Sequence, residues 1–148
     1  MGLGKQSKIL NKSQIEMVSN YLRSKRNGLR NQTIFLLSVK SGLRSKEISR
    51  LTWKEVCNSN GEGDEYINLT NRSSKGVSGR VIPLHKSIRL NLIGLLNEQR
   101  KFKNFNIDTD FVIRTERSSS TTSQSIVNMF QKWYRTLGLI GCSSHSGR

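Results

Sequence analysis

Residues 41–53 have the sequence Ser-Gly-Leu-Arg-Ser-Lys-Glu-Ile-Ser-Arg-Leu-Thr-Trp, which is the most informative stretch of the chain. It follows an apolar run, Thr33–Val39, that predicts a buried helix with Gly42 as its C-cap. A second, short helix is predicted over Ser45–Leu51. Arg44 therefore lies at a glycine-made corner between two helices. Because backbone holds it on both sides, its planar guanidinium could point at a phosphate with little freedom left to lose.

Glu47 follows Arg44 by three residues and is close enough to brace it. The plainer alternative is a surface Arg–Glu pair in a helix-turn-helix, which is the commoner arrangement for such a pair taken alone. The pair by itself leaves both interpretations open.

The rest of the pattern predicts a mainly α-helical protein with a small antiparallel β-sheet, an α+β fold. Ser13 and Glu16 match a capping box at a helix start. Ser87 is expected to cap a longer helix whose apolar side runs to Phe102, and Gly138 to end the last helix. The other predicted elements are helices over 13–26 and 125–137, strands over 66–70 and 80–84, and a connection over 75–79.

The chain is strongly basic. Its 148 residues include 25 Lys and Arg against 10 Asp and Glu, a formal net charge of +15. A compact protein with this excess is easiest to explain if its partner is a polyanion. The sequence contains no apolar run that would span a membrane or act as a secretory signal. Two distant cysteines, Cys57 and Cys142, fit a reducing cytosol and are expected to be buried or half-buried thiols.

Two further groups could carry chemistry. Lys75 lies beside a glycine in the predicted turn, where a lysine can enter a DNA groove and donate a proton. A solvated turn lysine is the commoner case. His145 and Arg148 would share a face at a helix start and could address one phosphate. For residues 145–148 taken alone, a capping segment with an incidental histidine is more frequent.

In order and spacing, these features resemble the catalytic domain of tyrosine recombinases, the phage-integrase family. Arg44 matches the first arginine of the pattern Gly-Leu-Arg-x-x-Glu-ϕ-x-x-Leu-x-Trp, where ϕ is apolar. Residues 75–84 match the run Lys-Gly-x-x-x-Arg-ϕ-ϕ-Pro-Leu. Residues 145–148 match the His-x-x-Arg box, with Gly147 in place of the usual leucine. The resemblance covers about residues 10–148.

The resemblance implies a phosphoryl transfer without a metal or other cofactor, in which a tyrosine attacks a DNA phosphate and frees a 5′-hydroxyl. Arg44 and Arg148 would bind the non-bridging oxygens. Lys75 would protonate the leaving 5′-oxygen, and His145 would assist proton transfer or hold the phosphate. Glu47 would orient Arg44. These groups would have to converge on one phosphodiester.

Three more basic residues are assigned to DNA binding: Lys46, Arg72 and Arg80. The expected partner is double-stranded DNA, bound by a homotetramer of the full-length protein, with no membrane involved. The expected function is site-specific DNA recombination or integration by strand breakage and rejoining. Such a protein would be encoded by a phage, prophage or other mobile genetic element and would work in the bacterial cytoplasm at the nucleoid.

The family's nucleophile lies beyond the His-x-x-Arg box, and none of Tyr21, Tyr66 and Tyr134 follows it. Tyr134 lies on an apolar helix stripe and is interpreted as a core residue. We therefore expect a basic N-terminal arm over 1–12 and, over 13–148, a partial catalytic domain without the C-terminal tyrosine segment. This polypeptide is expected to bind DNA and not to cleave it.

Two other functions remain possible from the sequence. One is a non-enzymatic helix-turn-helix DNA-binding module built on residues 29–56, which would explain the charge and the glycine corner. The other is an RNA-binding protein, which the charge suits but which lacks an aromatic strand face for stacking bases.

Overall fold

The computed structural model describes residues 8–69 and 79–146. In chain order its elements are α1 (Lys12–Arg23), α2 (Gly28–Val39), α3 (Ser45–Arg50), α4 (Trp53–Val56), β1 (Tyr66–Asn68), β2 (Val81–Pro83), α5 (Lys86–Gln99) and α6 (Ser123–Thr136). The described part of the chain is mostly helical and has a two-stranded antiparallel sheet, which confirms the predicted α+β class.

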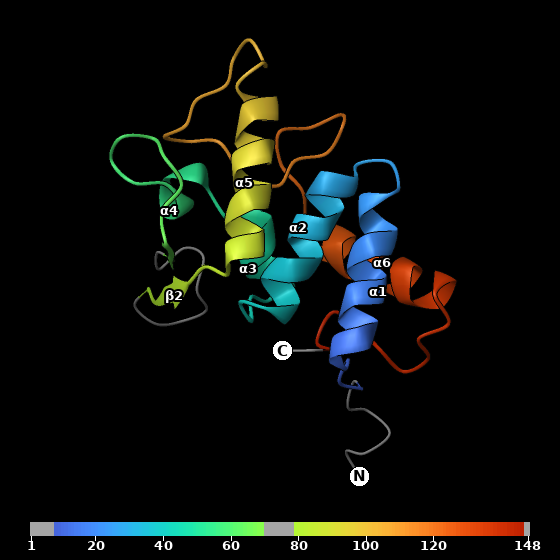
Figure 1. The fold of residues 1–148 in the computed structure, drawn as a ribbon. Coiled ribbons are helices and arrows are strands. Elements are labelled where there is room, and N and C mark those ends of the chain that lie inside the picture. Colours follow the sequence, from blue (N-terminus) through green and yellow to red (C-terminus); the bar gives the residue numbers. More distant parts are fainter. Residues whose placement is uncertain (1–7, 70–78, 147–148) are drawn as a thin grey trace.

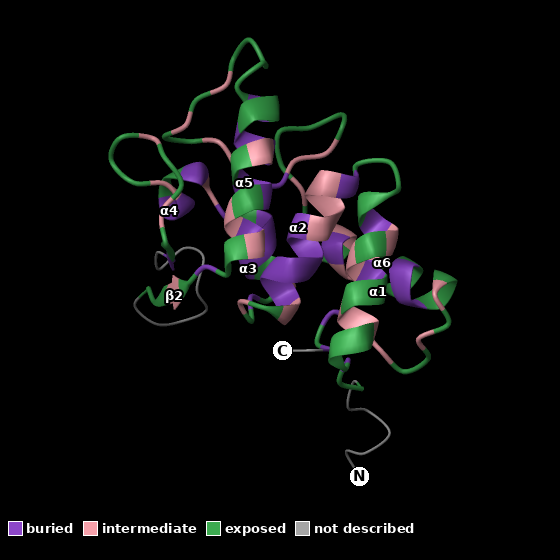
Figure 2. Cartoon of the chain, in the orientation of Figure 1, coloured by how far each residue is buried: buried purple, intermediate pink, exposed green. Residues whose placement is uncertain are grey.

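Helix α2 is the centre of the fold. Every residue from Thr33 to Ser38 is buried, because the helix is apolar almost all round. It packs against α1 on one side and α5 on the other (Figure 1). Figure 2 shows the same arrangement as a buried middle helix between two helices that each have an exposed face. The sequence predicted the buried run but not the first turn of α2, which begins at Gly28.

The aromatic side chains of α6 close the core. Phe130 lies 5.1 Å from Trp133 and 5.9 Å from Tyr134 between ring centroids, and 6.3 Å from Phe35 of α2. Tyr134 is 1% exposed, which confirms its interpretation as a core residue. Helix α3, which follows the corner after α2, also packs on α6.

The sheet pairs Tyr66 with Pro83, Ile67 with Ile82 and Asn68 with Val81. Both strands are shorter than predicted, and Pro83 stands at the end of its strand, as a residue without an N–H should. Ile67 is fully buried, and β1 also contacts α4. The sheet is therefore anchored to the helical body through its first strand.

Helix α4 has no counterpart in the sequence analysis, because one turn is too short to show a helical period. The indole N–H of Trp53, at its start, donates to the Gln99 side chain at 2.8 Å. The Gln99 amide donates in turn to the carbonyl of Val112 at 2.7 Å. This buried chain of hydrogen bonds ties α4 to the end of α5 and to the apolar segment at 110–113.

Two predicted helix caps were wrong. The capping box of α1 is formed by Asn11 and Gln14, two residues before the predicted pair Ser13 and Glu16. The amide oxygens of Asn and Gln can accept the same backbone N–H groups as the hydroxyl of Ser and the carboxylate of Glu, so the sequence matched two overlapping boxes. The N-cap of helix α5 is His85 and not Ser87. The Nδ1 atom of the His85 ring accepts the backbone N–H of Ser87.

The prediction that the apolar side of this helix runs to Phe102 was also wrong. Helix α5 ends at Gln99, and the Phe102 ring is 50% exposed beneath the guanidinium of Arg114, 4.1 Å from the ring centroid.

In the described residues, no helix is long and apolar enough to cross a membrane. The two cysteines are free and half-buried, as predicted, and burial raises the pKa of the Cys57 thiol.

Candidate phosphate-binding site

The corner between α2 and α3 is built around Gly42. Its φ of +70° lies in the left-handed region, where a Cβ would be strained. Its N–H donates to Ser38 at 3.0 Å, and the N–H of Leu43 donates to Leu37 at 3.1 Å, so the last carbonyls of the helix are satisfied. Leu43 is fully buried and fixes the chain on the far side of the turn. The predicted glycine C-cap was wrong in its position: the C-cap of α2 is Lys40, and Gly42 makes the left-handed turn two residues later.

Arg44 leaves this corner as the N-cap residue of α3, with an exposed side chain. Within residues 8–69 and 79–146, no carboxylate forms a salt bridge with its guanidinium. Glu47 does contact Arg44, but at the backbone: its Oε1 accepts the Arg44 N–H at 2.9 Å. Glu47 therefore fixes the position from which the Arg44 side chain starts and leaves the guanidinium to solvent.

The cation that Glu47 binds is Arg80. Both carboxylate oxygens of Glu47 lie 2.7 Å from Nη2 of Arg80. Arg80 immediately precedes β2, so this contact joins the sheet to the α2–α3 corner. The two residues belong to separate sequence motifs, and neither motif gives a sign that they pair. Lys75 and Arg72 lie outside the described residues, and Lys46 is exposed on α3.

The segment before the chain's last residues is a turn made by serines. Ser143 accepts the His145 N–H at its side chain and the Ser146 N–H at its carbonyl, at 3.2 and 2.9 Å. The Ser143 N–H donates to the Ser146 hydroxyl at 2.9 Å. Ser144 and Ser146 are buried, whereas His145 between them is exposed. A helix start was predicted at His145; the described residues show a turn as far as Ser146, and Arg148 lies outside them.

A single buried side chain joins this turn to the corner. The hydroxyl of Ser38, in the last turn of α2, donates to the carbonyl of Ser144 at 3.2 Å, across 106 positions of sequence. The carbonyl of the same Ser38 accepts the Gly42 N–H. Arg44 follows Gly42 by two residues and His145 follows Ser144 by one. Two exposed basic side chains from distant parts of the chain are thus brought to the same end of α2.

Sequence reasoning missed Ser38. A serine inside an apolar helix is the available signal, since a buried hydroxyl needs a hydrogen-bond partner, and helix position alone does not say which segment supplies it. It also missed the ion pair between Arg80 and Glu47. The sequence analysis assigns Arg80 to DNA binding.

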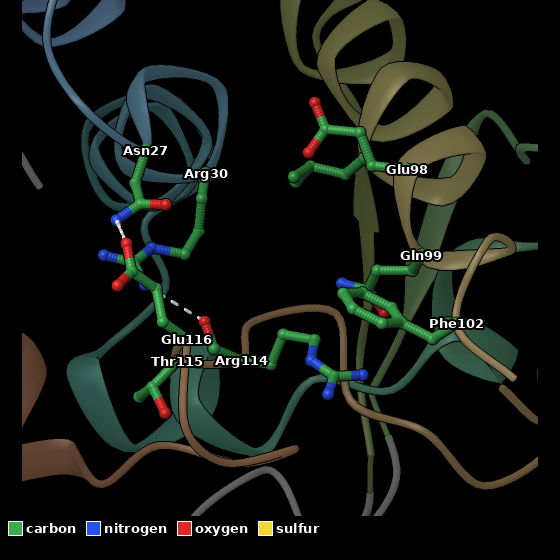
Figure 3. A pocket seen from close by; sticks show the side chains of 9 residues that line it. Asn27, Arg30, Glu98, Gln99, Phe102, Arg114, Thr115 and Glu116 are labelled. Atoms are coloured by element: carbon green, nitrogen blue, oxygen red, sulfur yellow. Dashed lines mark hydrogen bonds between the residues drawn. The ribbon is translucent and has the colours of Figure 1, made fainter. Parts of the chain in front are cut away.

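A pocket of about 160 Å³ lies elsewhere, at the other end of α2 (Figure 3). Two of its charged groups are already engaged: Glu116 accepts from Asn27 and pairs with Arg26 at 2.8 Å, and Arg30 donates to the carbonyl of Arg114. Hydrogen bonding from Asn27 lowers the pKa of Glu116, and burial lowers that of Arg30. We interpret this pocket as a structural junction between α2, α5 and the loop at 114–116.

Tyr134 is unsuited to chemistry on a bound ligand. Its hydroxyl is buried, and among the described residues it has no hydrogen-bond partner. Burial raises the pKa of this phenol well above its ordinary value. A nucleophilic tyrosine has to reach its target and lose its proton, and Tyr134 is placed for neither.

Comparisons with known proteins agree with the fold of the chain. A family model described as the phage integrase family matches residues 8–148. A comparison with curated proteins gave no match. Among solved structures, XerA recombinase superposes with a TM-score of 0.73 and 14% identity, over 93% of this chain and 46% of that one. The Tn1549 transposon integrase in complex with circular intermediate DNA superposes with a TM-score of 0.67 and 17% identity, over 93% and 48%. At these identities the likeness shows the fold, and the chain spans about half the length of these structures.

Proposed function

The chain belongs to the phage integrase family, and from that premise we propose that it supplies the phosphate-binding part of a site that breaks and rejoins DNA strands. The observation that carries this is the link through Ser38, which brings the segments of Arg44 and His145 to one end of α2 from distant parts of the sequence. Both side chains are exposed, so a phosphodiester could approach them from solvent.

In the proposed reaction, Arg44 binds a non-bridging oxygen of the scissile phosphate and offsets the charge that builds up in the transition state. His145 holds the phosphate or moves a proton on it. Lys75 and Arg148, which lie outside the described residues, complete the set by their match to the family motifs. Arg148 would be the second guanidinium, and Lys75 the acid that protonates the leaving 5′-oxygen.

We further propose that none of the tyrosines within residues 1–148 is the nucleophile. Tyr134 is buried in the aromatic cluster, and its pKa is raised. Tyr21 and Tyr66 precede the His-x-x-Arg box, which the nucleophile follows in this family. On this account the 148 residues bind DNA and prepare its phosphate, without forming a covalent bond to it.

The proposed partner is duplex DNA. The net charge of +15 favours a polyanion, and the structure of the Tn1549 transposon integrase, which shares the fold, was solved with DNA. A homotetramer on DNA for the full-length protein, a phage or mobile-element origin, and a cytoplasmic location at the nucleoid stay part of the same proposal. Lys46 and Arg72 stay assigned to DNA binding.

The test uses the rejoining half of the reaction, because that half needs no tyrosine. A nicked duplex carries a 3′-p-nitrophenyl phosphate on one side of the nick and a 5′-hydroxyl on the other. The 5′-oxygen attacks phosphorus, the bond to the nitrophenyl oxygen breaks, and nitrophenolate leaves with its electron pair. The proton of the 5′-hydroxyl passes to Lys75, which by microscopic reversibility is the base in this direction. A pool of duplexes with randomised flanks avoids the need for a known target.

The expected result is sealed DNA and coloured nitrophenolate from the wild-type chain. Arg44→Ala and His145→Ala should each slow release by about 100-fold, the order seen when one transition-state donor is removed. Arg117→Ala is the matched control, since Arg117 is an exposed arginine beside the pocket at the other end of α2. Binding of duplex with no nitrophenolate release would overturn the proposal and favour the helix-turn-helix alternative.

A further inference from the structure

The carboxylate of Glu47 serves two parts of the chain at once. One oxygen accepts the backbone N–H of Arg44 at 2.9 Å, and both oxygens contact Nη2 of Arg80 at 2.7 Å. The Glu47 side chain is 2% exposed, whereas that of Arg80 is 44% exposed. Glu47 is therefore the fixed member of the pair, and Arg80 reaches in to it from the surface.

A carboxylate this deeply buried needs a cation and hydrogen bonds to offset its lost hydration. Within the described residues, Arg80 is the basic side chain that forms a salt bridge with it. If Arg80 turned away to contact DNA, Glu47 would be a buried charge whose one remaining partner, among the described residues, is the Arg44 N–H. The energetics thus favour an Arg80 side chain that stays on Glu47.

Arg80 is also well situated to pass this restraint to the sheet. Its carbonyl accepts the N–H of Leu69 at 2.9 Å, directly beyond the paired residues Asn68 and Val81. The Glu47 contact therefore fixes both strands where they lead into residues 70–78. Lys75 precedes Arg80 by five positions in the sequence.

We propose that Arg80 is a positioning residue and not a DNA contact: through Glu47 it fastens the Leu69–Arg80 end of the β1–β2 pair to the backbone of Arg44. In this arrangement the distance between the strand ends and the Arg44 corner is set by one ion pair. The proposal rests on the proposed function and deepens it. Arg80 would hold two parts of the phosphate site, the strand ends and the Arg44 corner, in place relative to each other. It competes directly with the assignment of Arg80 to DNA binding.

The first test measures amide hydrogen exchange in the free protein and does not depend on any activity. Arg80→Ala and Glu47→Gln should each speed exchange of the Leu69 N–H by about tenfold, because the strand end is released, while the core amide of Leu22 keeps its protection. The double variant should exchange no faster than the faster single variant, because both changes remove the same contact. In Arg80→Ala the Arg44 N–H should stay protected, since Glu47 still accepts it.

The second test separates positioning from DNA contact. With the nicked nitrophenyl duplex at saturation, Arg80→Ala should lower the rate of release by about tenfold or more, because small displacements of reacting groups are costly. Its Kd for duplex and the salt dependence of that Kd should match the wild type. Arg80→Lys, which keeps the charge, should recover part of the lost rate, and Arg117→Ala should change none of these quantities.

Two results would overturn the proposal. One is unchanged exchange at Leu69 in both single variants. The other is a weaker Kd for Arg80→Ala with a salt slope reduced by about one and an unchanged saturated rate, which is the behaviour of a phosphate contact. If the wild-type chain releases no nitrophenolate at all, the proposed function fails, and the exchange measurement still decides whether the ion pair holds the strands.

Discussion

The hydroxyl of Ser38 donates a hydrogen bond to the carbonyl of Ser144, 3.2 Å away and 106 positions later in the chain. Ser38 is 1% exposed and lies in the last turn of α2, where its own carbonyl also accepts the N–H of Gly42. The two halves of the candidate site thus meet at one buried serine. Its neighbours, Arg44 on one segment and His145 on the other, are exposed.

Replacing Ser38 should weaken this junction. We expect Ser38→Ala to lower the free energy of unfolding by about 1–2 kcal/mol, because the buried Ser144 carbonyl loses its partner. It should also reduce nitrophenolate release, since His145 is no longer fixed relative to Arg44. Urea unfolding and the nicked-duplex assay measure the two effects. Ser24→Ala is the control: its hydroxyl makes an exposed, local bond to Tyr21, so stability should change by less than about 0.5 kcal/mol.

The shape of the corner should depend on glycine at position 42. Gly42 has φ +70° and open space around its Cβ position, so Gly42→Ala meets no clash and pays only the backbone strain, about 1–2 kcal/mol. Gly138 offers a matched control, with φ +72° and the same open surroundings after α6. Both variants should lose similar stability in urea. Only Gly42→Ala should also slow nitrophenolate release, and equal rates for the two would contradict the importance of this corner.

The buried phenol of Tyr134 should make stability fall at high pH. Its pKa is raised in the folded protein, so the folded state resists ionisation. The contribution of this group is intact below the unfolded phenol's pKa of about 10 and is lost as pH rises above it. Tyr134→Phe should therefore be at least as stable as the wild type at pH 7, because an unpartnered hydroxyl is removed, and increasingly more stable above pH 10. Urea unfolding at both pH values gives the comparison.

The same variant tests the proposed absence of a nucleophile. On a nicked suicide substrate, the wild-type chain and Tyr134→Phe should both give no covalent protein–DNA band. A covalent band from the wild type that disappears in Tyr134→Phe would mean that the nucleophile had been misassigned.

Binding to duplex DNA should be weak, poor in sequence preference and steeply dependent on salt. The net charge of +15 supports several phosphate contacts, and each releases counterions on binding. Fluorescence anisotropy across a salt titration measures the slope. An affinity that stays flat as salt rises would contradict a binding surface made of basic side chains.

How much of this could be read from the sequence differs between local and distant features. The buried run of α2, the glycine corner and the core position of Tyr134 follow from periodicity and backbone chemistry, and the structure confirms all three. Helix starts were less predictable, because Asn11 and His85 compete with nearby Ser13 and Ser87 as caps and only the packed helix selects one. Asn and Ser are about equally favoured at an N-cap, so sequence preference does not choose between Asn11 and Ser13.

The contacts that assemble the site were not predictable in the same way. Glu47 was expected to brace Arg44, and it does so at the backbone, while its charge goes to Arg80 from a different element. Ser38 and Ser144 carry no sequence signal of each other. Such pairings depend on how the elements pack, and no local pattern encodes them.

The most direct measurement is a structure of this chain bound to a nicked duplex that carries an intact phosphodiester beside the nick. The account predicts that the guanidinium of Arg44 and the imidazole of His145 both lie within hydrogen-bond distance, about 3 Å, of oxygens on the same phosphate. It would be contradicted if the two side chains bound different phosphates, or if DNA bound a face that leaves the end of α2 uncovered.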